Sequence, residues 1–522
     1  MREFTSNYHQ PKSLALEETP VRDGRDGLLI FALLFFGLAC VAALLFALLE
    51  GEVDFSTGNL YLWPWILLVL IVISIPPAYL ILRQRFDLFH PLVFASWSYF
   101  FPAFVLGSIF LATGISEPSF LHLISGQQYY LPLTLIYVAL GYVGLMAGFA
   151  LPWGRRPGAF LSRHVPSWNW HPPDLLLPCA LLLLLGQLFS LGALSAGAMG
   201  YQRVEAVESF NAVLIAMASL VSIASFLLWF AIFRAERLTL HYKIIIGLLV
   251  ISIPSSAIIA GSRGGLLRSL IPIAMAYWLS GRRIKLRHGV IFGMLLTLAL
   301  LVGMIYGSTF RFVKGTEDRM DVNTYLNTSA EAFDVIADRS LSENISFAFT
   351  QISERFETTS SLAVVVANYE KLNQFEADYG IANNIWTYTW TAFIPRLVWP
   401  DKPIISDARA YSALYFDFGG NSFAMTPIGD LLRNFGPLGI PLGMALLGFV
   451  LRILYTALVE GQMVSPWRAV AYYTVLTSVS YESFYGTILP ELIRTCVILM
   501  LGCLLINVLV RSSSSSSRRS FA

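Results

Sequence analysis

Arginines beside glycines carry the first chemical signal in this sequence. The stretch AGSRGGLLRSL at 260–270 places Arg263 among Gly261, Gly264 and Gly265, where two apolar runs meet. Unpaired backbone amides at a helix N-terminus, together with a guanidinium, favour an anion such as phosphate. Arg268 lies more than one turn inside the next apolar run, where an arginine costs about 2.5–3.5 kcal/mol, so it should face a wet cavity or a carboxylate. A tight hairpin with a snorkelling Arg263 and a structural ion pair at Arg268 are the alternatives.

A second group of basic residues lies in the stretch 310–435, and it comprises Arg311, Arg355, Arg396, Lys402 and Arg409. Arg396 and Lys402 belong to FIPRLVWPDKP at 393–403, where prolines restrict the backbone and favour a stiff, extended path. Tryptophans around this stretch are typical interfacial anchors, and aromatic faces also stack on sugar rings. We expect the segment to hold its basic side chains over phosphate groups, and a solvated charge is the alternative for each of them.

One carboxylate has the surroundings of a general base. Glu482 lies in SYESFYG near the outer end of an apolar run, whereas Asp430 lies with Arg433 in PIGDLLRNFG among the charges of the outer stretch. A carboxylate at such a depth either shifts its pKa upward or finds a cationic partner. Glu482 is therefore a candidate base or, equally, a neutralising partner for Arg268 or Arg494. Arg494 follows Glu491 by three residues, a spacing that also indicates a structural pair on one helix face.

The composition identifies the elements that must position these side chains. Of the 522 residues 56% are apolar and 13% are charged, which is typical of a polytopic membrane protein. We expect an all-α integral membrane protein with about 12 transmembrane helices. Windows of about 20 residues place them at 28–49, 62–82, 91–113, 129–151, 174–195, 210–233, 242–260, 264–280, 288–309, 436–458, 468–485 and 488–510.

The charges between these runs predict the topology. Arginine and lysine gather in alternate connections, for example at Arg83 and Arg85, whereas the other short connections are mainly acidic. The positive-inside rule then places both termini in the cytoplasm. The chain divides into a cytoplasmic tail (1–27), nine spans (28–309), one large helical periplasmic loop (310–435), three spans (436–510) and a disordered cytoplasmic tail (511–522). Loops of this length usually carry function.

Cofactor and nucleic-acid chemistry have no support in the sequence. There is no CxxC motif and no histidine cluster, so we expect neither a metal nor another cofactor. The net charge of +2 is too small to indicate nucleic acid as a partner. The cysteines all lie in apolar runs, where they act as small apolar side chains.

Three motifs give the chain a family resemblance. These are GSRGG at 261–265, IPRLVWPDKP at 394–403 and PIGDLLRNFGPLGIPLG at 427–443. In order, spacing and topology the chain resembles the Wzy-type O-antigen and exopolysaccharide repeat-unit polymerases over roughly residues 90–500. The family typically has Glu where this chain has Asp430, and an apolar or aromatic residue where it has Arg433.

The resemblance implies a metal-independent glycosyltransferase of the bacterial inner membrane. It would transfer a growing glycan from undecaprenyl pyrophosphate to an incoming lipid-linked repeat unit at the periplasmic face, to make O-antigen, capsule or exopolysaccharide. Its partners would be that lipid-linked oligosaccharide, the bilayer, and a chain-length regulator and flippase of the same pathway. Guanidinium groups would bind the leaving pyrophosphate, and Asp430 or Glu482 would act as the base.

Three other functions stay open at this point. An O-antigen ligase usually carries a catalytic histidine in the outer loop, and residues 310–435 contain none. A transporter or flippase of lipid-linked oligosaccharide would also need a basic cavity, although its charges should line a path through the membrane centre. A non-enzymatic scaffold would tolerate loss of Arg263 and Arg396.

Overall fold

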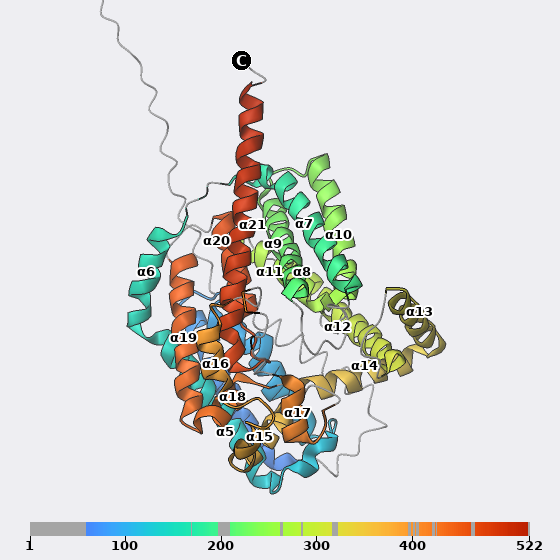
Figure 1. Ribbon diagram of the computed structural model, residues 1–522, viewed down its shortest axis with the longest axis vertical. Helices are drawn as coiled ribbons and strands as arrows, with labels where there is room; N and C mark the ends of the chain where they lie inside the picture. Colours follow the sequence, from blue (N-terminus) through green and yellow to red (C-terminus); the bar gives the residue numbers. More distant parts are fainter. Residues whose placement is uncertain are drawn as a thin grey trace, which may run out of the picture.

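The computed structural model describes residues 59–166, 168, 170–196, 209–260, 265–282, 286–315, 322–394, 398–399, 402, 407–419, 423, 425–460 and 465–519. Within these residues every regular element is a helix. A few helical residues, Arg268 among them, are described by their backbone alone. Figure 1 shows long helices side by side, with α15–α18 gathered at one end of the bundle and the C-terminal part of α21 projecting from the other. We call the first of these the loop end.

Eight helical stretches in the described part of the chain are long and apolar enough to cross a bilayer. They agree closely with spans expected from hydropathy. They are Leu60–Leu82, Pro91–Ala112, Gln127–Ala150, Pro172–Ser195, Val213–Arg234, Arg287–Lys314, Gly439–Leu458 and Tyr485–Ser512. The expected span 28–49 lies outside the described residues, so the count of twelve stays a prediction.

The first half of the chain contains most of the expected spans. Its elements are η2 (Leu60–Leu62), α2 (Trp63–Leu82), α3 (Pro91–Ala95), η3 (Ser96–Leu106), α4 (Gly107–Ala112), η4 (Ser119–Leu123), α5 (Gln127–Ala150), η5 (Pro152–Gly154), α6 (Arg155–His164), η6 (Pro172–Leu175), α7 (Leu176–Ser195), α8 (Ser209–Ala218), α9 (Leu220–Arg234), α10 (Leu240–Ala260) and α11 (Gly265–Leu279). Helices α10 and α11 lie at the positions of the spans expected at 242–260 and 264–280, although they are not among the eight stretches named above.

The second half contains the expected outer loop and the last spans. Its elements are α12 (Leu286–Lys314), α13 (Val322–Asp338), α14 (Leu341–Phe356), α15 (Thr359–Leu372), η7 (Asn373–Phe375), α16 (Asn384–Thr391), α17 (Ala408–Phe416), α18 (Pro427–Phe435), α19 (Gly439–Leu458), α20 (Pro466–Ser478) and α21 (Tyr485–Arg519). The stretch expected as a loop is thus largely helical where it is described, and α15 packs on α5, α16 on α21 and α18 on α19.

The expected span 468–485 is interrupted. Its helix, α20, ends at Ser478, and the backbone from Val479 to Phe484 is not helical. At 1.5 Å per residue α20 is about 20 Å long, which is less than the roughly 30 Å of a hydrocarbon core. Irregular backbone at such a depth is tolerated where protein or a wet cavity surrounds it. Residues 479–486, which we call the broken segment, include Glu482.

Small residues let two of the spans approach closely. A Cβ on Gly144 or Gly148 of α5 would run into the backbone of Pro441 or Ala445 of α19, and one on Gly448 would meet the backbone of Leu145. Close backbone packing of this kind stabilises helix pairs in membranes, where hydrophobic burial gives no driving force. The α5–α19 pair therefore forms a rigid support beneath α15 and α18.

A π-helix forms the middle of the second described span. The eleven residues Ser96–Leu106 take this wider form between α3 and α4, and π-helical turns occur often at functional sites. Directly after it, Gly107 faces the backbone of Phe356 and Glu357, where a Cβ would collide. Ser108 Oγ lies 2.7 Å from Thr359 Oγ1. The junction between α14 and α15 is therefore docked tightly against this span.

Candidate functional site

An ion pair joins two predicted site residues from distant parts of the chain. Arg355 lies in the last turn of α14, and its Nη2 contacts Oε1 of Glu482 in the broken segment. The two side chains are 49% and 32% exposed, so both remain open to a ligand. The sequence suggested Arg268 or Arg494 as the partner of Glu482. Instead, the structure pairs Glu482 with Arg355, and Arg494 pairs with Glu491 at 2.7 Å.

Aromatic side chains of the π-helix hold the broken segment beside this ion pair. Tyr99 stacks on Tyr481 with ring centroids 6.1 Å apart, and Phe100 meets Tyr481 edge-on at 5.5 Å. The Tyr99 hydroxyl is shielded from solvent, and it feels the charges of both Glu482 and Arg355. A guanidinium, a carboxylate and a phenol therefore meet at the loop end, on a support of packed rings.

A buried carboxylate follows Arg355 by two residues. Glu357 is 5% exposed, and its carboxylate accepts hydrogen bonds from the backbone N–H of Ser360, at 2.8 Å, and from the Ser360 hydroxyl. Burial raises the pKa of Glu357 to about 7, although these hydrogen bonds oppose the shift. The Glu357 carboxylate therefore binds donors in the first turn of α15. This local structural role accounts for a buried carboxylate here without a catalytic one.

Asp430, the other predicted base, belongs to a fully buried polar network. Its carboxylate accepts from Arg433 (Nη2, 2.9 Å), from Asn384 (Nδ2, 3.0 Å) and from the backbone N–H of Gly486 (3.0 Å). Asp430 is 0% exposed. Arg433 reaches on to Glu376, with 2.8 Å between Nη1 and Oε2, and to the Ile381 carbonyl at 3.0 Å. We call Asp430, Arg433, Glu376, Asn384 and Tyr415 the buried network.

One guanidinium serves two carboxylates in the buried network. Burial lowers the pKa of Arg433, but Asp430 and Glu376 outweigh this effect and leave the pKa raised. Burial raises the pKa of Glu376, and Arg433 opposes that shift. Tyr415 donates its hydroxyl to Glu376 Oε1 at 2.8 Å. Every charged group here is thus paired and hydrogen-bonded, as burial requires.

The buried network fixes the broken segment at its C-terminal end. Gly486 donates to Asp430, and the guanidinium carbon of Arg433 lies over the Phe484 ring at 5.7 Å. A Cβ on Gly486 would press on Asn384 and Ile385, so the network also requires a small residue there. Glu482, only a few residues earlier, is therefore held between Tyr481 on one side and this anchor on the other.

The other predicted residues that the structure describes lie in surroundings of their own. Lys402 donates from Nζ to the Thr391 and Ile394 carbonyls, at 2.7 and 3.2 Å, and so closes the C-terminus of α16. The Arg409 backbone N–H donates to its N-cap, Asp407, at 2.8 Å. Arg311 is exposed in the last turn of α12. Arg263 and Arg396, and the side chain of Arg268, lie outside the described residues, so a shared arginine pocket stays a prediction.

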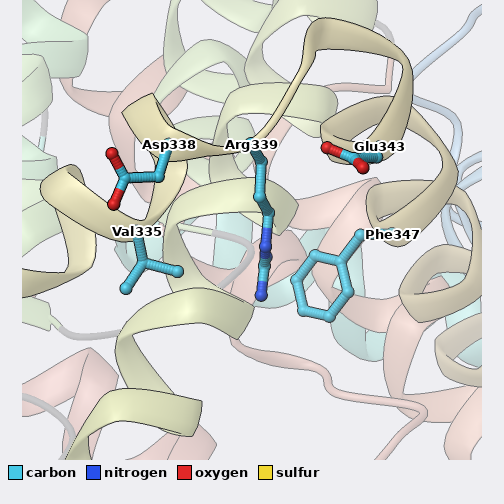
Figure 2. Close-up of a pocket in the computed structure, with 5 residues that line it drawn as sticks. All are labelled: Val335, Asp338, Arg339, Glu343 and Phe347. Carbon is cyan, nitrogen blue, oxygen red and sulfur yellow. The ribbon is translucent and has the colours of Figure 1, made fainter.

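A separate hollow of about 470 Å³ surrounds Arg339 at the turn between α13 and α14. Figure 2 shows its guanidinium pointing between Val335 and Phe347, away from the carboxylates of Asp338 and Glu343. The guanidinium lies 4.7 Å from the Phe347 ring centroid. One guanidinium and two carboxylates give this hollow a net negative charge, so it does not favour a phosphate.

Sequence reasoning missed Glu376, Asn384, Glu357 and Tyr99. Glu376 and Asn384 lie in polar stretches where nothing in the sequence separates a buried side chain from a solvated one. Tyr99 lies in an aromatic run that reads as an ordinary span. For the buried network, the sequence indicates only the pairing of Arg433 with Asp430, because the two residues are three positions apart on one helix face.

No family model matches the chain, and neither do the curated proteins or the solved structures with which it was compared. Among the described residues, no group of three or more histidines, cysteines, aspartates or glutamates could hold a metal ion.

Proposed function

We propose that the chain is a membrane glycosyltransferase that polymerises oligosaccharide units linked to undecaprenyl pyrophosphate. The observation that carries the proposal is the half-exposed ion pair of Arg355 and Glu482 at the loop end. These residues come from a stretch expected to bind phosphate and from one expected to supply a base. On this proposal the loop end faces the periplasm.

On this proposal, Arg355 and Glu482 neutralise each other when no substrate is bound. A diphosphate binds a guanidinium in a bidentate manner and carries more charge than one carboxylate, so it competes with Glu482 for Arg355. Once displaced, the Glu482 carboxylate is free to accept a proton. Substrate binding and activation of the base are then one event.

The chemical step follows from these roles. The acceptor hydroxyl oxygen forms a bond to the anomeric carbon of the growing glycan, and the bond from that carbon to the pyrophosphate oxygen breaks. The proton of the hydroxyl goes to Glu482, a general-base contribution of about 10²–10⁴-fold. Arg355 stabilises the charge that develops on the leaving pyrophosphate, and Arg263, Arg268, Arg311 and Arg396 are proposed to assist it.

Asp430 receives a different role from the one that its sequence suggests. Its carboxylate is 0% exposed and already accepts several hydrogen bonds, so it does not meet the acceptor hydroxyl in this arrangement. We assign Asp430 to positioning, because it anchors the segment that carries Glu482. Glu482 is then the base.

The test is a gel profile of surface glycan from strains that carry Arg355→Ala or Glu482→Gln, with protein levels measured in membranes. We expect both strains to lose long chains and to accumulate single units attached to their final acceptor. The matched control is Arg494→Ala, because Arg494 and Glu491 form a separate ion pair of similar exposure, 54% and 40%, within α21. Normal chain lengths in both site variants would refute the proposal. Loss of every outward-facing intermediate would indicate a transporter.

A further inference from the structure

Helix α13 carries an apolar stripe that is largely exposed among the described residues. Leu326, Ala330, Phe333 and Ala337 are all exposed, Leu326 by 60% and Phe333 by 57%. Their spacing of four, three and four residues puts them on one side of a helix. A stripe of this kind on a surface helix marks a contact with lipid or with another protein.

The other two faces of α13 are of different character. Tyr325 and Ala332 are buried, and Tyr325 packs against Phe310 of α12. A third face lies roughly 90° from the apolar stripe at 100° per residue. Its members are all polar and exposed, namely Asn323, Asn327, Glu331, Asp334 and Asp338. The helix therefore has one side for protein, one for an apolar medium and one for water.

The contacts with α12 place the apolar stripe beside a candidate membrane span. Tyr325 meets Phe310 with ring centroids 4.9 Å apart, and Phe333, farther along α13, meets Tyr306, earlier in α12, at 5.2 Å. Helix α13 thus runs back along α12, which is long and apolar enough to cross a bilayer. Tyr306 lies about 12 Å before the last residue of α12, at 1.5 Å per residue. The apolar stripe therefore lies alongside the last turns of α12.

We propose that α13 lies beside the C-terminal part of α12 at the edge of the bilayer, with its apolar stripe against lipid and its acidic face in water. The partner is the lipid bilayer itself, because the stripe lies beside a helix long and apolar enough to cross a membrane, and a separate face of α13 is polar and exposed. This inference does not depend on glycosyl transfer.

The lipid contact also bears on Arg355. Asn344 of α14 donates to the Ile336 carbonyl of α13 at 2.9 Å, and Ser340 and Glu343 form a capping box at the start of α14. The angle between the two helices is therefore fixed locally. Figure 1 shows the pair projecting to the side of the bundle, with α14 running across the direction of α21. A bilayer that holds α13 thereby sets the height of Arg355, at the far end of α14.

Spin labels in reconstituted full-length protein test the proposal. With the native cysteines replaced by alanine, single cysteines would be introduced as Leu326→Cys and Phe333→Cys on the apolar stripe. Their matched controls are Asn327→Cys and Asp334→Cys on the polar face. We expect the stripe labels to be relaxed more by oxygen, which partitions into lipid, than by a water-soluble nickel chelate, and the control labels to show the reverse. Equal access to the chelate on both faces, or exclusion of both reagents from the stripe, would overturn the proposal.

A second measurement avoids the cysteine replacements. The photoreactive residue p-benzoylphenylalanine would take the place of Phe333 or, as the control, of Asp334 in the otherwise native chain, in vesicles of phosphatidylethanolamine and phosphatidylglycerol. Irradiation should add the mass of one phospholipid at position 333 and none at 334. Attachment to a second copy of the chain at 333, or no lipid there, would count against a lipid contact.

Discussion

Two sets of ion pairs lie at the loop end, and they differ in their access to water. Arg355 and Glu482 are 49% and 32% exposed, whereas Arg433, Glu376 and Asp430 are between 0% and 2% exposed. Both sets join the expected outer loop to the broken segment. Yet a ligand in solution can reach only the first set.

This difference separates chemistry from support. An exposed ion pair contributes about 0–1 kcal/mol to stability, so its partners can exchange for a charged ligand at little cost. A buried pair that loses one partner leaves an uncompensated charge, which costs about 3–5 kcal/mol. The first set is thus suited to binding and the second to holding the binding residues in place.

The largest effect is expected from Arg433→Ala. The substitution leaves Asp430 and Glu376 buried without their cation, so the free energy of unfolding should fall by about 3–5 kcal/mol. Folded protein in membranes and the thermal melt of the detergent-purified chain measure this loss. Arg355→Ala is the control, and its melt should lie near that of the wild type. Similar melts for the two variants would remove the distinction between the sets.

Reversing the exposed pair separates a structural role from a catalytic one. The double variant Arg355→Glu with Glu482→Arg keeps an ion pair but puts the carboxylate where the phosphate-binding cation was. We expect its melt to stay near that of the wild type, while polymerisation falls by about 10²-fold or more, as loss of a general base implies. Glycan chain length reports the second effect. Recovery of long chains in the double variant would show that only the pairing matters.

Glu357 is a third kind of carboxylate at the loop end. It is buried, and its hydrogen-bond donors are a hydroxyl and a backbone amide rather than a guanidinium. Its pKa of about 7 lies above the 4.5 of an ordinary glutamate, so its contribution to stability is fully present below pH 4.5 and is lost as the pH rises through about 7. That difference corresponds to about 3 kcal/mol. Thermal melts from pH 5 to 8 should fall more steeply for the wild type than for Glu357→Gln. The exposed control Glu354→Gln should keep the wild-type slope.

Much of the fold could be predicted from the sequence, because apolar length alone places a span. The bounds of α2, α5, α7 and α19 each lie within a few residues of the expected spans. The break after Ser478 could not be predicted in this way. Its residues, VSYESF, include two serines and Glu482 but no glycine or proline that would indicate a break. Its irregular backbone is stabilised by Tyr99, Phe100 and Asp430, which lie far away in the chain.

The candidate site was likewise predictable in part: the sequence indicates single residues but not their partners. The sequence predicts Glu482 from its charge in an apolar run and Arg355 as a basic residue of the expected outer loop, and both predictions use only nearby residues. The pairing of Arg355 with Glu482 could not be predicted in this way, since the sequence alone favours Arg268 or Arg494 as the partner of Glu482. Asp430 was found for its charge but assigned to catalysis. Its partners Asn384 and Glu376 come from the loop, and only the folded chain brings these groups together.

The smallest expected effect tests how completely the buried network is satisfied. In Tyr415→Phe the hydroxyl that donates to Glu376 at 2.8 Å is removed, while Arg433 still neutralises the carboxylate. A hydrogen bond to a charged group contributes about 1.5–3 kcal/mol, and the remaining contact with Arg433 should keep the loss near the lower end. The melt should therefore drop by less than that of Arg433→Ala. Tyr411→Phe, a buried neighbour whose ring lies 5.1 Å from that of Tyr415, controls for loss of a phenol elsewhere in the same core. If Tyr415→Phe lowered the melt as much as Arg433→Ala, the hydroxyl rather than the guanidinium would be the main partner of Glu376. The buried set would then depend on a neutral hydrogen-bond donor as well as on its ion pairs.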